Sequence, residues 1–358
     1  MFGVSDLKCQ LSDFSPDLII VDKELHAHIV VALSTGRRVM LSSSMYPSSP
    51  ALSAPPLHLL QVPGRGLSGT RIAIAGSWAI YLLRKGSRIL RRMWRDHGAD
   101  HMTALSALAR QHAVPLHRLR RWSAWQFPWG YRLPTLVLRP AALDLPGKSD
   151  AGVHYLGPLI WKQRPEDHNQ HCAIEHFRKP SVGKARIYVA FGSRITPDDL
   201  FLNRLWKVAA RQPNWTMLAV VGSHWTAAQM QAPPANVRIV TWAPQLEMLE
   251  HADLAILHGG TAGVMEAVAA HTPMLIYPHE LDQAGNASRV VFHHLGRAGT
   301  LRDSAQRIEE DINAVLADDT IRLACARMKG RFDNEDPDQI IDDILLDQNV
   351  IGNANSLI

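Results

Sequence analysis

Short apolar runs and helix-like stretches alternate in the first part of the chain. Residues 17–22 form an apolar run that ends in Asp22, a helix-like stretch covers 24–34, and a second apolar run covers 37–41. Short continuous apolar runs are typical of parallel strands that are buried on both faces. This part of the chain is therefore predicted to form a strand, a helix and a strand.

The region that follows is predicted to change from a long loop to helices and back to a strand. Residues 42–70 are rich in Ser, Pro and Gly, which favours a loop. Residues 71–121 are predicted to carry two or three helices, and 135–138 a strand. Residues 142–182 contain Pro, Gly, His and charge without periodicity, so an interdomain connection is expected there.

The alternation becomes regular in the second half of the chain. Apolar runs separated by helix-like stretches lie at 186–191, 215–221, 236–240, 253–257 and 273–277. This order is typical of a doubly wound α/β domain with a parallel sheet. Residues 304–329 are predicted to form two helices, and an acidic stretch with a polar end follows Gly330.

Length and composition favour two α/β domains. The chain has 358 residues, of which 46% are apolar and 20% are charged. This length exceeds the ~250–300 residues at which a single core stops growing. The predicted parts are an N-terminal domain over 1–165, a linker over 166–182, a C-terminal domain over 183–330 and an acidic tail over 331–358.

Cysteine content and apolar run length bear on localisation. Three cysteines cannot form a disulfide framework and are interpreted as free thiols in a reducing compartment. No apolar run reaches 18 residues, and the first residues lack the order of a secretory signal. A cytoplasmic protein is therefore expected, with peripheral membrane attachment left open.

Positive charge is concentrated in one segment. The chain carries a net +5, yet residues 81–132 hold eleven Arg or Lys against two Asp, which is +9 and leaves −4 elsewhere. Five tryptophans lie within or beside this segment, at 78, 94, 122, 125 and 129. The segment is either a solvated basic face or a peripheral contact with an anionic membrane through 71–132. No nucleic-acid-binding motif accompanies the charge, so no nucleic-acid partner is expected.

A glycine-rich turn follows the predicted strand 253–257. Its sequence is His258, Gly259, Gly260, Thr261, Ala262 and Gly263, and a helix is predicted to start near Val264. Ligands of parallel sheets bind at the carboxyl ends of strands, where helix N-termini favour anions. Glycines allow backbone N–H groups to approach a phosphate closely. The turn is therefore a candidate phosphate site, and a merely tight strand-to-helix turn is the alternative.

Residues before and after this turn add the other groups that a nucleotide-sugar needs. Trp242 and Gln245 follow the strand 236–240 and supply an aromatic plane and an amide. Glu266 lies one turn into the predicted helix, and Asp282 with Gln283 follows the next strand. A ring for a base, a carboxylate for ribose hydroxyls and polar groups for a sugar predict a nucleotide-sugar site.

This set of residues closely resembles the nucleotide-binding signature of the UDP-glycosyltransferases, glycosyltransferase family 1. The matching stretch reads W-A-P-Q-x3-L-x-H, then H-G-G, then E, then P-x3-D-Q-x2-N-A-x-R-V. The turn at Gly192 and Ser193 is similar to the one after the family's first C-domain strand. The resemblance covers the chain from about Asp17 to Gly330.

The resemblance implies a role for each matching residue and a GT-B fold of two Rossmann-like domains with parallel sheets. Trp242 would stack on uracil, with Gln245 beside the nucleoside and Glu266 on the ribose hydroxyls. The implied diphosphate contacts are His258, Gly259 and Gly260, with Ser193 near the phosphates, and the implied sugar contacts are Asp282 and Gln283. The implied activity is inverting, metal-independent transfer of a hexose from a UDP-sugar to a hydroxyl of a small-molecule or lipid-like acceptor.

The sequence departs from the family pattern in two places. The family motif includes a hydroxyl residue where this chain has Ala262 and Gly263, so that hydroxyl is missing. The hydroxyl of the adjacent Thr261 is the candidate replacement. The N-terminal domain is also predicted to be truncated relative to the family. The first βα unit of the family, which carries its histidine base, has no counterpart here. Asp22 matches the carboxylate that orients this base, and His26 is the candidate replacement, against the alternative of a helix-face histidine that binds nothing.

Several explanations of the missing base remain open. The chain is truncated at its start, or a partner chain supplies the missing unit, or the protein binds a nucleotide-sugar without catalysis. A related UDP-sugar epimerase is a weaker alternative, because the Asp282-Gln283 pattern favours a transferase. The expected small molecules are therefore a UDP-sugar co-substrate and an acceptor, with no cofactor and no metal.

Overall fold

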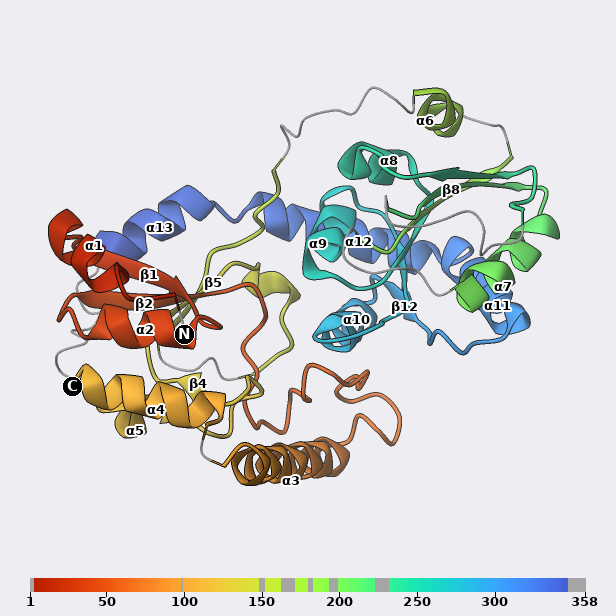
Figure 1. The fold of residues 1–358 in the computed structure, drawn as a ribbon. Helices are drawn as coiled ribbons and strands as arrows, with labels where there is room; N and C mark the ends of the chain where they lie inside the picture. The colour runs from red at the N-terminus through yellow and green to blue at the C-terminus, as the bar shows by residue number, and fades with distance from the viewer. Residues whose placement is uncertain are drawn as a thin grey trace. The chain divides into compact units, whose positions relative to one another are not determined.

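The protein is described from a computed structural model, in which two compact units are distinguished (Figure 1). The structure describes residues 3–97, 99–147, 152–161, 171–179, 183–192, 199–222 and 232–346. The first unit comprises Met1–Pro56, Pro63–Leu159 and Glu335–Ile358. The second comprises Leu57–Val62 and Ile160–Asn334.

The first unit contains a four-stranded parallel sheet in the order β1-β2-β5-β6. Its strands are β1 (Leu18–Asp22), β2 (Arg38–Ser43), β5 (Thr135–Val137) and β6 (Val153–Tyr155). The helix α2 (His26–Leu33) joins β1 to β2, and seven of its eight residues are buried. The predicted strand, helix and strand at the start of the chain are therefore confirmed, with the core formed by both faces of α2 and the sheet.

Three helices follow the long loop, in agreement with the prediction of two or three. They are α3 (Arg71–Arg95), α4 (His101–Gln111) and α5 (Leu116–Leu119). The Thr70 hydroxyl caps α3 and the Asp100 carboxylate caps α4, because each accepts hydrogen bonds from N–H groups of the first turn. Among the residues described, none of the helices is both long and apolar enough to cross a bilayer.

The connection predicted over 142–182 contains two regular elements. β6 pairs in parallel with β5, and α6 (His171–Arg178) belongs to the second unit. β6 (Val-His-Tyr) is half-buried at all three positions and has a polar residue at its centre, so it forms no apolar run that would reveal a strand. The 3₁₀ turn η1 (Ala141–Leu143), the short helix α1 (Leu7–Phe14) and the hairpin of β3 (Arg120–Arg121) with β4 (Gly130–Tyr131) complete this unit apart from α13, described below.

The second unit is a doubly wound α/β domain, as the sequence predicts. Its six parallel strands lie in the order β12-β11-β10-β7-β8-β9. They are β7 (Ala185–Ala190), β8 (Trp215–Val220), β9 (Val237–Val240), β10 (Leu254–Leu257), β11 (Met274–Ile276) and β12 (Gly296–Ala298). Only β12, again three residues long, lies outside the predicted strands. The chain order reverses between β7 and β10, and ligands of such sheets bind outside the carboxyl ends of the strands at this switch point.

Helices connect these strands and pack against one another (Figure 1). They are α7 (Asp199–Ala210), α8 (Gln245–His251), α9 (Thr261–Ala269), α10 (Gln283–Phe292), α11 (Ala305–Leu316) and α12 (Asp319–Asp333). α7 contacts α11, and α9 contacts both α8 and α12. The two helices predicted over 304–329 are α11 and α12.

The structure departs from the predicted domain limits at two places. Residues 331–358, predicted to be an acidic tail, contain α13 (Pro337–Leu346), whose Ile340, Ile341 and Ile344 pack on an apolar cluster of the first unit. Because acidic residues lie between these isoleucines, the sequence did not reveal the apolar face of α13. Leu57–Val62 belongs to the second unit, because the Leu57 carbonyl accepts a 2.7 Å hydrogen bond from the Gly285 N–H.

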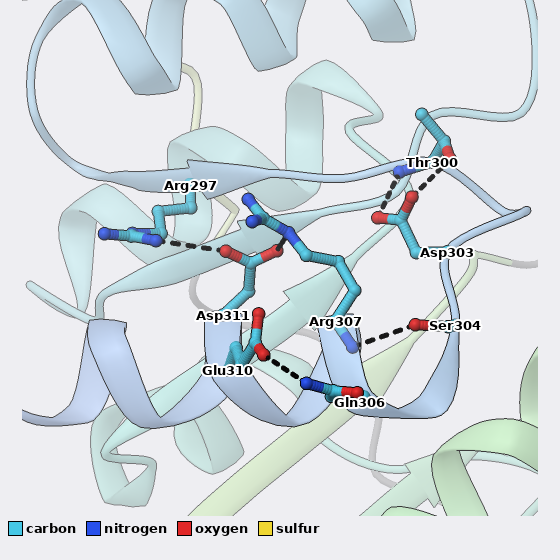
Figure 2. Close-up of polar contacts among 8 residues, drawn as sticks. All are labelled: Arg297, Thr300, Asp303, Ser304, Gln306, Arg307, Glu310 and Asp311. Carbon is cyan, nitrogen blue, oxygen red and sulfur yellow. Dashed lines mark hydrogen bonds and ion pairs between the residues drawn. The ribbon is translucent and has the colours of Figure 1, made fainter.

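A buried carboxylate ties α11 to the edge strand β12 in the second unit (Figure 2). The side chain of Asp311 is only 1% exposed, and its two oxygens accept hydrogen bonds from Arg297 at 3.1 Å and Arg307 at 2.8 Å. Both guanidinium groups are about half exposed, so their charges remain partly hydrated. The carboxylate of Asp311 is therefore the charge in this cluster that has lost most of its hydration, and its two arginine partners compensate for that loss.

Replacing Asp311 with alanine is expected to lower the free energy of unfolding by about 2 kcal/mol, since two charge-assisted hydrogen bonds are lost. Chemical denaturation of the purified protein measures this change. Glu310→Ala is the matched control, because Glu310 is the exposed neighbour whose only contact drawn in Figure 2 is with Gln306. Its replacement is expected to change stability by less than about 0.5 kcal/mol. Equal effects of the two substitutions would contradict this account of Asp311.

Candidate functional site

The glycine-rich turn lies at the switch point of the second unit. His258, Gly259 and Gly260 join β10 to α9, and Gly192 follows the neighbouring strand β7. Gly259 has a φ of +88° and Gly192 a φ of +78°, which is the left-handed region that favours glycine. The predicted turn therefore occupies the place where an open parallel sheet binds its ligand.

The imidazole of His258 packs directly over glycine backbone. A Cβ atom at Gly192 would lie 2.9 Å from His258 Cε1, and one at Gly260 would lie 2.4 Å from His258 Nε2. A Cβ at Gly259 would lie 2.8 Å from the Ile276 side chain and 2.9 Å from the Gln283 carbonyl oxygen. A side chain at any of these three positions would collide with His258, Ile276 or the Gln283 backbone, so the close packing of this turn requires glycine.

His258 is a neutral group in this environment. Burial, with a smaller contribution from His279, lowers the pKa of His258 to about 4, although the Ala190 carbonyl and Asp282 act in the opposite direction. Its buried Nδ1 atom finds no hydrogen-bond partner among the described residues. A neutral imidazole donates from one ring nitrogen and accepts at the other, so it is suited to form a hydrogen bond with a bound anion rather than to neutralise it by charge.

Asn286 joins the two loops of this site. It is 2% exposed, and its Nδ2 lies 2.9 Å from the Gly259 carbonyl oxygen, 3.0 Å from Thr261 Oγ1 and 3.1 Å from Asp282 Oδ2. Thr261 also donates to Asp282 Oδ2 at 3.3 Å. A single amide therefore fixes the turn after β10 to the loop that carries Asp282.

Gln283 shapes the same loop from within. Its Oε1 accepts hydrogen bonds from the N–H groups of His279 at 2.8 Å and Glu280 at 3.1 Å, and the residue is 5% exposed. The sequence predicts that Gln283 binds a transferred sugar, but this oxygen is already used by the backbone. Asp282, which is half-buried, is the better placed member of the predicted pair.

The predicted nucleoside residues also come together. Gln245, the first residue of α8, donates from Nε2 to Glu266 Oε2 at 2.6 Å. Glu266 lies on α9 and is 3% exposed. Trp242 is half-buried and stands three residues before Gln245, in the connection that leaves the carboxyl end of β9. Amide, carboxylate and indole thus belong to the same edge of the sheet as the glycine-rich turn.

The predicted residues of the first unit are arranged differently from the prediction. His26 is 5% exposed, with Nδ1 at 2.8 Å from the Tyr131 hydroxyl and Nε2 at 3.4 Å from the Phe127 carbonyl oxygen. Burial lowers its pKa to about 4. Asp22 ends β1 and accepts a 2.8 Å hydrogen bond from the Glu24 N–H. Both ring nitrogens of His26 are therefore used by partners other than Asp22, which fits a structural histidine.

Two further points complete the comparison with the predicted site. Ser193 lies outside the described residues. The described part of the chain holds no group of three or more His, Cys, Asp or Glu placed to bind a metal ion.

Asn286 is a functional residue that the sequence analysis did not assign. It belongs to the sequence motif, but spacing alone does not show which side chain turns inward.

Replacing Asn286 with alanine is expected to weaken UDP binding by about tenfold and to lower stability by about 2 kcal/mol, since two buried acceptors lose their donor. Calorimetric titration with UDP and chemical denaturation measure the two effects. Asn313→Ala, at an exposed position of α11, is the control and is expected to change neither. Unchanged UDP affinity in a folded Asn286→Ala protein would show that the amide does not position the turn.

A family model matches the part of the chain that carries this site. Residues 220–345 match the C-terminal domain described as erythromycin biosynthesis protein CIII-like. The match includes Trp242, the turn at His258 and the loop at Asp282, and it extends into α13.

Curated relatives are glycosyltransferases. The oleandomycin glycosyltransferase of Streptomyces antibioticus is 28% identical over 160 residues, which cover 44% of this chain and 37% of the relative. The zeaxanthin glucosyltransferase of Pantoea ananas is 26% identical over 341 residues, which cover 92% of this chain and 72% of the relative. The matches span only about two fifths of the length of several relatives, such as 42% of the demethyllactenocin mycarosyltransferase of Streptomyces fradiae.

Solved structures with the same fold are also glycosyltransferases. The kitacinnamycin glycosyltransferase gives a TM-score of 0.69 at 20% identity, covering 96% of this chain and 79% of that protein. A spinosyn rhamnosyltransferase solved with thymidine diphosphate gives 0.60 at 14% identity, covering 96% and 76%. At these identities the likeness establishes the fold.

Proposed function

We propose that this chain is a GT-B glycosyltransferase of family 1 that transfers a hexose from a UDP-sugar to a hydroxyl of a small-molecule or lipid-like acceptor, as its sequence matches and its fold support. The acceptor oxygen attacks the anomeric carbon from the face opposite UDP. The bond from that carbon to the diphosphate oxygen breaks, and its electron pair leaves with UDP. The acceptor proton passes to a base, and the configuration is inverted.

One observation carries the donor part of the proposal. His258, three glycines without room for a side chain, and the Gln245–Glu266 pair all belong to the carboxyl edge of one parallel sheet. The turn supports a diphosphate, the carboxylate supports ribose hydroxyls, and Trp242 supports the base. Asn286 holds Asp282 beside the turn at Gly259 and Thr261, and the proposal assigns this carboxylate to the hydroxyls of the sugar.

Stabilisation of the leaving UDP follows from the same geometry. α9 begins at Thr261, directly after the glycines, so its first N–H groups lack partners within the helix and carry the positive end of the helix dipole. Together with a hydrogen bond from neutral His258, these groups stabilise negative charge that develops on the diphosphate. The proposal therefore requires no metal ion.

The acceptor side of the proposal rests on the names of relatives and on two residues of the first unit. Relatives carry the names of zeaxanthin and ecdysteroid glucosyltransferases, which favours an apolar acceptor by analogy. His26 is enclosed by Tyr131 and Phe127, so it can act as base only after one of these contacts opens. Asp22, at the carboxyl end of β1, remains the candidate carboxylate of the first unit.

The enclosure of His26 favours a second function, a nucleotide-sugar-binding protein without catalysis of its own. In a split enzyme of this kind, a partner chain would contribute the base. Binding of UDP with no transfer and no hydrolysis of UDP-glucose would support this alternative. Peripheral membrane contact through 71–132 is a separate part of the proposal and depends on α3.

Calorimetric titration with UDP, UDP-glucose and thymidine diphosphate tests the donor site. Micromolar binding of UDP is expected in the wild-type protein, and Trp242→Ala is expected to weaken it by about 10–100-fold, because base stacking on an aromatic ring contributes about 1–3 kcal/mol. Trp161→Ala is the control, since this exposed tryptophan lies outside the sheet edge. No binding of any nucleotide to the folded protein would contradict the proposed donor site.

A further inference from the structure

One face of α3 anchors this helix to the first unit. Ile74, Trp78 and Lys85 are buried, and at 100° per residue their side chains fall within about 40° of the helix circumference. Lys85 Nζ donates to the carbonyl oxygens of Trp122, Ala124 and Gln126 at 3.1, 2.7 and 2.6 Å. The helix is therefore held firmly along one side only.

A second face of α3 is apolar and exposed. Ile72, Leu83, Leu90 and Trp94 are 86%, 75%, 67% and 83% exposed. At 100° per residue they fall within about 40° of one another, away from the anchored face. Other exposed apolar residues of the second unit, such as Leu200 and Leu323, stand singly on their helices. A continuous exposed stripe of this kind marks an interaction surface.

A third face carries the positive charge. Arg84, Arg88, Arg91 and Arg95 recur at intervals of four, three and four residues, so they line one flank of the helix. α3 contains no Asp or Glu in its 25 residues. Arg88 also lies 5.6 Å from the centre of the Phe127 ring, and Arg95 forms a 2.8 Å ion pair with Asp96, the residue that follows the helix. Arg84 and Arg91 are the arginines of this flank that contact neither the Phe127 ring nor a carboxylate among the described residues.

We propose that α3 docks this protein on an anionic lipid surface, with the stripe of Ile72, Leu83, Leu90 and Trp94 inserted at the headgroup level and the arginine flank on the lipid phosphates. An apolar stripe beside a basic one, without acidic residues, is the pattern of helices that lie in a membrane interface. Trp94 places its amphipathic ring at the end of the stripe, where the headgroup boundary favours it. The inference does not depend on the proposed glycosyltransferase activity.

The charge pattern selects this occupant over a second protein chain. A purely apolar contact between two copies would bring two arginine flanks of like charge near each other. Anionic headgroups instead neutralise each arginine and add about fivefold to partitioning per basic residue. The polar groups of the anchored face are satisfied by loop carbonyls, so docking requires no unfolding of α3.

Cosedimentation with vesicles tests the proposal. The wild-type protein is expected to bind vesicles of phosphatidylcholine with phosphatidylglycerol in low salt, to dissociate in high salt, and to bind phosphatidylcholine alone weakly. Leu83→Gln with Leu90→Gln is expected to weaken binding by more than about tenfold. Arg84→Gln with Arg91→Gln is expected to weaken it by about 30-fold, and to reduce the salt dependence.

Matched controls lie on α12 of the second unit. Leu323→Gln removes a comparably exposed leucine, and Arg327→Gln with Arg331→Gln removes two exposed arginines. The arginine pair carries the same change in charge as Arg84→Gln with Arg91→Gln, and Leu323→Gln carries one of the two leucine changes. Both variants are expected to bind as the wild type does. All substitutions are at exposed positions, so their thermal unfolding is expected to match the wild type.

Fluorescence and mass measurements separate the outcomes. Quenching by brominated anionic lipid is expected to fall when Trp94 is replaced by leucine. Wild-type protein that stays in the supernatant with anionic vesicles in low salt overturns the proposal. So does a dimer in solution that Leu83→Gln with Leu90→Gln dissociates, because the stripe is then covered by a second copy.

Discussion

Replacing His258 with alanine is expected to lower transfer from UDP-glucose by about 10²–10³-fold, the usual cost of losing one preorganised donor to a developing anion. The imidazole packs over Gly192 and Gly260, and its Nδ1 has no other partner among the described residues. Initial rates at saturating acceptor measure the loss. His258→Gln, which keeps an N–H donor, is expected to retain part of the activity.

The pH dependence distinguishes a neutral from a charged His258. Burial holds its pKa at about 4 in the folded protein, below the ordinary value of 6.5. The ring is therefore neutral from pH 6 upward, and affinity for UDP-glucose is expected to be flat between pH 6 and 9. A histidine of ordinary pKa would instead lose its charge, and with it affinity, as the pH rises through 6.5. UDP-glucose is the suitable ligand because its diphosphate does not titrate in this range.

Because the pKa of His258 is lowered in the folded protein, acid is expected to decrease the stability of the protein. Between pH 6.5 and about 4 the unfolded state binds a proton at His258 and the folded state does not, so stability falls as the pH falls. His117→Ala, at an exposed histidine of α5, is the control for kinetics and stability. Unchanged transfer in His258→Ala would exclude the ring from the donor site.

The sequence predicts the longer elements of both units because burial on both faces leaves continuous apolar runs. β7, β8 and β10 match predicted runs, and so does β11, whose three residues are all apolar and buried, whereas β6 (Val-His-Tyr) and β12 (Gly-Arg-Ala) contain polar or glycine positions and form no apolar run. α13 was hidden for another reason. Its isoleucines face Met40, Leu136 and Leu156, while its carboxylates dominate the local composition.

In the candidate site, residue spacing predicts which residues come together but not the direction in which their side chains point. Spacing places Gln245, Glu266 and His258 at strand ends or helix starts, and parallel pairing then gathers them at one edge. Which polar atoms are used internally depends on side-chain direction. Gln283 turns toward its own loop and His26 toward Tyr131, and neither orientation follows from the order of residues.

Replacing Gly260 with alanine is expected to weaken UDP binding by about 10–100-fold, because the displaced His258 loses its hydrogen bond to a charged diphosphate, and such a bond contributes about 1.5–3 kcal/mol. The new Cβ would lie 2.4 Å from His258 Nε2, so the imidazole must leave its position. Gly259→Ala is expected to act similarly and also to strain the backbone, since its φ is +88°. Calorimetry with UDP measures both losses.

Gly263→Ala is the decisive control for the turn. Gly263 lies in α9, four residues beyond Gly259, and a Cβ there would meet its nearest atom, Gln245 Nε2, at an ordinary 3.7 Å. Alanine is expected to stabilise the helix by about 0.5–1 kcal/mol and to leave UDP affinity within about twofold. If Gly263→Ala and Gly260→Ala weakened UDP binding equally, the effect would belong to α9 as a whole. Only a loss confined to Gly259 and Gly260 ties the affinity to the turn itself, where Gly260 packs against His258 and Gly259 against Ile276 and the Gln283 backbone.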